Sequence, residues 1–276
     1  MLDILTLWKW PLIASLILPW LLVYLGLHIV RRGVIFVDLA LAQMAAFGTC
    51  MSMVYGYDVH DWQSYVFSLG FTFVGAVLLT FTRTRHQTVP QEALIGIVYV
   101  VAAAAAILAL SQGTGGTEEL QRSLVGELLT VKPPEVMKTF GFFVGIGIVH
   151  VIFRKKFLAI SADAEAAAAS GIKVRWWDFL FYILFGVVVT SFVHIGGVLL
   201  VFSYLVVPAV CATFLVNSIP ARFGVGWAIA TACSVASLII SVKKDLPFGA
   251  AIVCILGIAL VIVMMASRLL RRSGHG

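Results

Sequence analysis

The stretch FLFYILFGVVVTSFVHIGGVLLVFSYLVVPAVCATFLV, residues 179–216, contains no Asp, Glu, Lys or Arg. A helix needs roughly 20 apolar residues to cross the hydrocarbon core of a bilayer, so the chain here predicts two spans, near 177–194 and 196–217. Almost no loop separates them. The join at Ile195-Gly196-Gly197 therefore predicts a break in the helix, where the chain need not emerge fully from the membrane.

The apolar character continues outward from this stretch over the whole chain. Hydrophobic residues make up 61% of the 276 residues and charged residues 12%, about half the charge of a soluble domain. A cytosolic enzyme, a secreted disulfide scaffold and a disordered polymer all fit this composition poorly. We expect an all-α, polytopic integral membrane protein with about nine transmembrane helices in a single domain over 1–276, eight and ten crossings being the alternatives. The other predicted spans lie near 11–30, 34–55, 62–82, 91–111, 136–153, 223–241 and 247–267.

The chain is basic, with a formal net charge of +6. Its Lys and Arg residues gather in short clusters between apolar spans, which indicates membrane topology and not a nucleic-acid partner, because basic residues accumulate on the cytoplasmic side of the bilayer. If the spans alternate, thirteen of the 19 basic residues lie on one side. We therefore expect the N-terminus outside and the C-terminus in the cytoplasm. The thirteen are Arg31, Arg32, Arg83, Arg85, Arg154, Lys155, Lys156, Lys173, Arg175, Arg222, Arg268, Arg271 and Arg272.

The predicted cytoplasmic loop 154–178 has the sequence RKKFLAISADAEAAAASGIKVRWWD. Ser161 is the expected N-cap of a short helix, with Asp163 and Glu165 in its first turn near the positive end of the helix dipole. The alanines favour a helix, and Gly171 is the expected C-cap. A helix of about ten residues is too short and too polar to cross the bilayer. Two interpretations are open: a solvated linker, or a docking helix for a cytoplasmic partner.

Four segments together resemble one family, the membrane permease subunits of bacterial ATP-binding cassette (ABC) importers for zinc, manganese and related divalent ions. SADAEAAAASGIKV, residues 161–174, resembles the cytoplasmic coupling helix of that family. GGVLLVFSYLVVPAVCA, residues 196–212, is similar to its Gly- and Leu-containing signature with Pro-Ala. QEALIGIVYVVAAAAAILAL, residues 91–110, and DLPFGAAIV, residues 245–253, resemble the openings of a middle span and of the last span. The matches occur in the family's order over nearly the full chain.

The resemblance implies a permease in a bacterial inner membrane, a homodimer or pair with the ion path between its subunits. It also implies two ATP-binding subunits below, a metal-binding protein outside, and a divalent cargo: zinc first, manganese or iron next. No tightly bound cofactor is expected. The chain has no Gly-x-x-x-x-Gly-Lys-Ser/Thr phosphate loop, so we expect ATP to be bound by the partner and this chain not to be an enzyme. The residues expected to couple the permease to the ATPase are Asp163, Glu165, Ala168, Ser170 and Gly171.

In many members of that family the second span carries an Asp and, four residues later, a His that line the translocation path. Leu39 and Gln43 stand at these positions here, with an acid one place earlier at Asp38. The usual ligand pair is therefore absent, and a shift of one residue turns a side chain about 100° around a helix. Two interpretations of Asp38 are open: it lines the path, with Gln43 as a polar companion, or it forms an ion pair with Arg32.

Polar residues on the outer side are further candidates for the ion path. Asp58, His60 and Asp61 lie in the loop between the second and third spans and offer carboxylate and imidazole, ligands that suit manganese and zinc. An ordinary solvated turn is the alternative. His194 lies beside the expected helix break and is either a path residue or a hydrogen-bonded residue between helices. The second outer loop, 111–135, is expected to carry a short surface helix near 120–130.

The competing functional class is a secondary carrier driven by an ion gradient. Such a carrier should place more acids or histidines in the middle of the membrane, and the spans of this chain hold few. Glu92, at the start of its span, is expected to cap a helix or form a salt bridge. His28 and His150 precede basic clusters and are expected at the membrane interface.

Overall fold

A computed structural model describes residues 2–59, 61–82, 90–111 and 128–273. The regular secondary structure in these ranges is entirely helical, which confirms the predicted all-α class. Most of the predicted surface helix at 120–130 lies outside the described residues, and only the 3-10 turn at its end is seen. The elements are α1 (Leu2–Arg32), α2 (Val37–Val54), α3 (Trp62–Thr82), α4 (Gln91–Leu110), η1 (Leu128–Thr130), α6 (Pro133–Ile152), α7 (Arg154–Ala162), α8 (Ala164–Ala169), α9 (Val174–Leu215), α10 (Ile219–Lys244) and α11 (Phe248–Ser273).

Eight helices within the described ranges are long and apolar enough to cross a membrane: α1, α2, α3, α4, α6, α9, α10 and α11. Each predicted span overlaps one of them, and two predicted spans, 177–194 and 196–217, fall in α9. The expected nine crossings and the eight observed helices therefore differ only in how α9 is counted.

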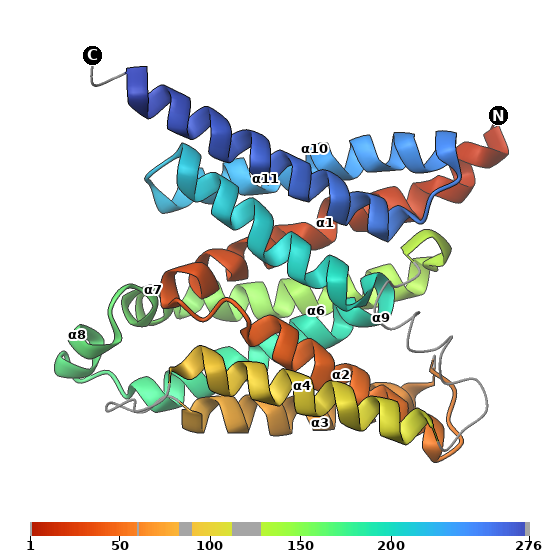
Figure 1. Ribbon diagram of the computed structural model, residues 1–276. Coiled ribbons are helices and arrows are strands. Elements are labelled where there is room, and N and C mark those ends of the chain that lie inside the picture. Colours follow the sequence, from red (N-terminus) through yellow and green to blue (C-terminus); the bar gives the residue numbers. More distant parts are fainter. Residues whose placement is uncertain (1, 60, 83–89, 112–127, 274–276) are drawn as a thin grey trace.

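The long helix α9 is bent in its middle. It has 42 residues, which at about 1.5 Å per residue is about 63 Å, or twice the thickness of the hydrocarbon core. Gly197 has φ 73° and ψ 167°, a combination that is essentially restricted to glycine. Figure 1 shows α9 running from the end of the bundle that carries α7 and α8 to the opposite end, where it turns back. The predicted break at Ile195-Gly196-Gly197 is confirmed.

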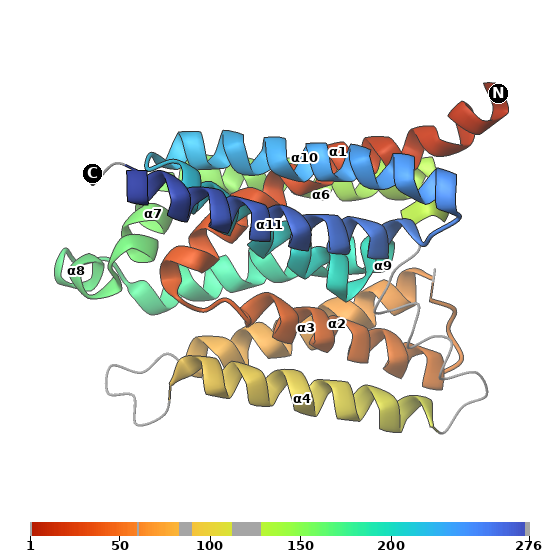
Figure 2. The same cartoon turned by 45° about the horizontal axis from the view of Figure 1, so that its top comes forward.

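The core of the molecule lies around α9, which contacts α1, α2, α3, α10 and α11. Figures 1 and 2 show α2, α3 and α4 gathered on one side of α9, with α1, α6 and α10 on the other. Aromatic side chains of α9 fill the space between these groups. Its fully buried aromatic residues are Phe181, Tyr182, Phe185, Phe192 and Tyr204.

Close packing holds the spans together, since lipid tails are as apolar as the side chains and give no hydrophobic driving force. A Cβ atom at Gly26 of α1 would lie 1.9 Å from the carbonyl oxygen of Leu205 in α9, so only glycine allows this approach of the two backbones. Thr72 of α3 and Thr190 of α9 add a hydroxyl–hydroxyl hydrogen bond of 2.8 Å.

The two ends of the bundle differ in what they carry. Figure 1 shows the N-terminal and C-terminal ends at opposite ends of the bundle, with α7 and α8 on the side of the C-terminal end. An odd number of crossings produces this arrangement. The basic clusters predict that the end with α7 and α8 is cytoplasmic, and it is called the inner end below.

The bend at Gly197 generates a prediction about stability. Gly197→Ala should lower the free energy of unfolding by about 1–3 kcal/mol, because alanine is strained at these backbone angles. Thermal unfolding of the purified protein in detergent would measure the loss. Gly70→Ala in α3 is the matched control, since a Cβ atom there meets no atom within 4 Å. Equal unfolding temperatures for the two variants would contradict the assigned role of Gly197.

Candidate functional site

The inner end carries the short helix α8, which has six residues. Its N-cap is Asp163, whose Oδ1 accepts hydrogen bonds from the backbone N–H groups of Glu165 at 2.9 Å and Ala166 at 3.0 Å. The prediction of Ser161 as N-cap is wrong, because Ser161 lies buried in the last turn of α7. The predicted length of about ten residues is also wrong, because the extended backbone at Asp163 separates α7 from α8.

The other end of α8 agrees with the sequence prediction. Gly171 has φ 86°; its N–H bonds to the carbonyl of Ala168 at 3.0 Å, and the N–H of Ile172 bonds to that of Ala167 at 3.1 Å. These two bonds form a Schellman motif, which ends a helix at glycine. Only Ala167 of α8 is buried. The predicted coupling residues therefore form a projecting surface, with Ala168 half-buried and Asp163, Glu165, Ser170 and Gly171 exposed.

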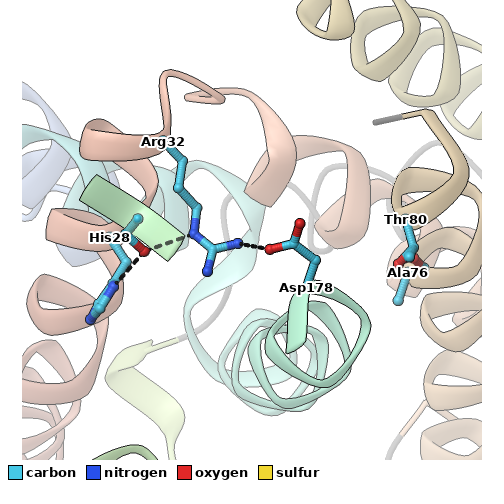
Figure 3. A network of polar contacts seen from close by, with 6 residues as sticks. His28, Arg32, Ala76, Thr80 and Asp178 are labelled. Atoms are coloured by element: carbon cyan, nitrogen blue, oxygen red, sulfur yellow. Dashed lines mark hydrogen bonds and ion pairs between the residues drawn. The ribbon is translucent and has the colours of Figure 1, made fainter. Parts of the chain in front are cut away.

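At the base of the segment that carries α8, a network of polar contacts joins α1, α7 and α9. Nη1 of Arg32 donates to Oδ1 of Asp178 at 2.8 Å, and both side chains are almost fully buried. Nε of Arg32 donates to Oγ of Ser161 at 2.9 Å, and the same oxygen lies 2.9 Å from Nδ1 of His28. Figure 3 shows His28, Arg32 and Asp178 facing one another in this network. The alternative in which Arg32 pairs with Asp38 is wrong, because the ion pair of Arg32 is with Asp178 and none joins it to Asp38 within the described ranges.

The two histidines near the inner end were expected at the membrane interface, but both are buried inside the bundle. His28 and His150 are 2% and 1% exposed. Nδ1 of His150 donates to the carbonyl of Ile146 at 3.0 Å, and its ring stacks on Phe157 of α7 with centroids 4.6 Å apart. Tyr24 packs edge-on against both imidazoles. Aromatic packing thus surrounds the polar network and excludes water from it.

Asp38 and Gln43, which the sequence suggests as residues of the ion path, lie buried in α2. Asp38 is 0% exposed and Gln43 4%. Among the residues that the structure describes, no side chain donates a hydrogen bond to the carboxylate of Asp38 or to the amide oxygen of Gln43. Both side chains therefore offer oxygen atoms inside the bundle that could serve as ligands of a cation. Glu92, by contrast, accepts a hydrogen bond of 3.4 Å from the backbone N–H of Ile35, in the turn between α1 and α2. The expected capping role is wrong, because neither α2 nor α4 has a side-chain cap.

At the outer end, a cavity of about 180 Å³ opens between the beginnings of α3 and α6 and the middle of α9. Asp61 and His194, two predicted path residues, line this same cavity. Nδ1 of His194 donates to the carbonyl of Thr190 at 2.9 Å, and its ring lies edge-on to Tyr65 with centroids 5.6 Å apart. His194 thus satisfies both interpretations of the sequence, since it is hydrogen-bonded between helices and faces a cavity.

The remaining outer candidates are placed differently. Asp58 donates its backbone N–H to the carboxylate of Asp61 at 3.0 Å and does not line the cavity. His60 lies outside the described residues. Within the described ranges, no three His, Cys, Asp or Glu side chains are grouped closely enough to hold a metal ion together. The cavity therefore has carboxylate and imidazole groups in its lining, but not the closed set of ligands that holds a structural metal ion.

Sequence reasoning missed several residues of these sites. Glu135 and Lys138 of α6 line the outer cavity, and Nζ of Lys138 lies 4.4 Å from the ring centroid of Tyr65. Their positions at the start of α6 carry no sequence signal for contact with α3. Asp178 has a sequence signal for pairing with Arg32, because it is an acid at the start of an apolar span near basic residues. Asp38 has the same signal. Ser161 carried none beyond its capping propensity.

The model of the ABC 3 transport family matches residues 5–267. The chain belongs to the ABC 3 transport family. This match confirms the family resemblance, and the chain is a multi-pass membrane permease of that family. Two relatives are named for manganese. The manganese import permease ScaB of Streptococcus gordonii is 24% identical over 83% of this chain and 80% of its own length. The manganese transport membrane protein MntC of Halalkalibacterium halodurans is 25% identical over 62% of this chain, which spans 59% of that relative.

A solved structure supports the fold of the permease. The PsaBC complex of Streptococcus pneumoniae, solved with a Fab fragment, contains a chain with a TM-score of 0.79 and 22% identity. The match covers 95% of the present chain and 93% of that one. The present chain and that chain therefore share one overall fold.

The cap of α8 in this permease can be tested by exchange of its amide hydrogens. Asp163→Ala should speed hydrogen–deuterium exchange across 164–169 about fivefold, because an N-cap contributes roughly 1 kcal/mol to a helix. Asp163→Asn is the matched control and should leave exchange nearly unchanged, since asparagine caps equally well. Mass spectrometry of peptides from the intact protein measures both. Identical exchange in the alanine variant and the parent would contradict the cap.

Proposed function

We propose that this permease carries a divalent transition-metal ion inward across the bacterial inner membrane, driven by ATP that a separate subunit hydrolyses. The observation that carries the proposal is the state of Asp38, a fully buried carboxylate that has no side-chain hydrogen-bond or ion-pair partner among the described residues. A charged side chain within a span costs roughly 3 kcal/mol unless a cavity, a partner or a cation offsets the cost. A dication passing along α2 would supply that offset.

We further propose manganese ahead of zinc as the ion, which reverses the order suggested by the sequence. The polar atoms available inside α2, a carboxylate and an amide oxygen, are hard donors that suit manganese better than zinc, which favours imidazole and thiolate. Gln43 stands where many family members have a histidine. The names of the two relatives point the same way. Zinc and iron, which imidazole suits better than these oxygen ligands do, are the alternative ions.

The proposed partners follow from three surfaces. The exposed side of α8, with Asp163, Glu165 and Ser170, would dock on the ATP-binding subunits, two of which would serve two permease copies. The outer cavity, with Asp61 and His194, would receive the ion from an external metal-binding protein. A second copy of this chain would complete the ion path at the interface between the permeases.

The alternative function is a secondary carrier that uses an ion gradient. The small number of buried ionisable groups disfavours it, because coupling ions need their own binding groups in the membrane. ATP dependence separates the two functions directly. Vesicles that contain the permease and its ATP-binding subunit should take up manganese only with ATP, and an ion gradient alone should give no uptake. Uptake that persists without the ATP-binding subunit would favour the carrier.

In the same vesicles, Asp38→Asn should lower manganese uptake at least about tenfold at an unchanged rate of ATP hydrolysis, because the amide keeps the size of the side chain and removes the charge that faces the cation. Glu92→Gln is the matched control, since its amide oxygen can still accept the bond from Ile35. Radioactive manganese, with zinc as competitor, measures uptake and preference together. Equal uptake by the two variants would remove Asp38 from the path.

A further inference from the structure

Both ends of the segment that carries α8 meet at one side chain. Ser161 lies at the end of α7, just before α8, and Asp178 lies in the first turns of α9, just after it. Arg32 of α1 holds both: Nε donates to Ser161 and Nη1 to Asp178. A guanidinium has rigid donors pointing in different directions, so Arg32 closes the segment 161–178 into a loop that is fixed at its base.

The clamp is built from buried groups. The side chains of Arg32 and Asp178 are 1% and 2% exposed, and the centre of the guanidinium lies 3.9 Å from the ring centroid of Phe181. Because Nε of Arg32 donates to Oγ of Ser161, the hydroxyl hydrogen of Ser161 is available for Nδ1 of His28, 2.9 Å away. Ser161 is therefore attached to α1 twice. Salt does not screen such contacts as it screens pairs on the surface.

The chain on both sides of α8 is, by contrast, not helical. Asp163 is extended, with φ −158° and ψ 108°, and Gly171 has a positive φ of 86°. Both turns are held by hydrogen bonds, the N-cap bonds of Asp163 and the Schellman bonds at Gly171. A displacement of α8 therefore reaches the two ends of the segment, residues 161 and 178, which Arg32 holds.

We propose that Arg32 is the positioning residue that fastens the α7–α8 segment to the spans, so that a displacement of α8 moves α1 and α9 together. The inference rests on the proposed function, because it assumes that α8 receives the movement of an ATP-hydrolysing subunit. Arg32 touches neither the ion nor ATP. It sets how much of the movement at α8 becomes a movement of the spans.

The test measures metal ions transported per ATP hydrolysed in vesicles that contain the complete complex. Ser161→Ala should lower this ratio at least about fivefold, the change expected for the loss of even one of its two buried hydrogen bonds, while ATP hydrolysis continues at the parent rate. Arg32→Lys should lower it at least as much, because an ammonium group cannot hold both partners in the same geometry. The double variant should lose less than the product of the two single losses, since both changes break the contact between Arg32 and Ser161.

Ser237→Ala is the matched control, because Ser237 is equally buried and, as far as the described residues go, its hydroxyl donates to the carbonyl of Cys233 in its own helix and joins no two helices. Its ratio should equal that of the parent. If Arg32→Lys fails to assemble, Ser161→Ala alone decides, since alanine is favourable within α7. An unchanged ratio in Ser161→Ala, or equal losses of transport and hydrolysis, would overturn the clamp. A parent complex that transports without ATP would instead overturn the proposed function.

Discussion

The buried ion pair between Arg32 and Asp178 is the contact on which the inner end of the permease depends. Removal of two charges from water costs several kcal/mol for each ion, and only close contact with further hydrogen bonds offsets that cost. Here the pair is 2.8 Å long, Ser161 takes a second donor of the guanidinium, and Phe181 covers its face. The pair ties α1 to α9 and leaves α8 as the part that projects. Within the described ranges no ion pair is formed by Asp38, and this carboxylate is the group that we propose to meet the cargo ion.

The spans could be predicted from sequence because the bilayer allows so few solutions. In hydrocarbon every backbone N–H and C=O must be paired within the protein, which restricts the chain to helices whose length the membrane sets. The break at Gly197 was likewise predictable, since two spans without a loop must turn back at a residue that tolerates unusual backbone angles. Gly171 could be assigned for a related reason, as the residue that ends α8.

Contacts between distant helices could not be predicted in this way. Asp38 and Asp178 carry the same signal, an acid near a cluster of arginines, and only the packing of α1 against α9 decides which of them meets Arg32. Ser161 has the composition of a helix cap, but the extended backbone two residues later gives that role to Asp163. The outer cavity combines α3, α6 and α9, so its sequence-distant residues Glu135 and Lys138 could be recognised only once the fold was known.

The central claim is that the end carrying α7 and α8 faces the cytoplasm, where movement generated by an ATP-hydrolysing subunit is received. Ala166→Cys on exposed α8 and Lys132→Cys at the N-cap of α6, a helix that begins at the opposite end of the bundle, test it with a membrane-impermeant maleimide. Each is made with Cys254→Ala to remove the exposed native thiol. In spheroplasts, whose inner membrane is intact, the cysteine at 132 should be labelled and the one at 166 only after that membrane is permeabilised. Labelling at 166 while the membrane is intact would contradict the account.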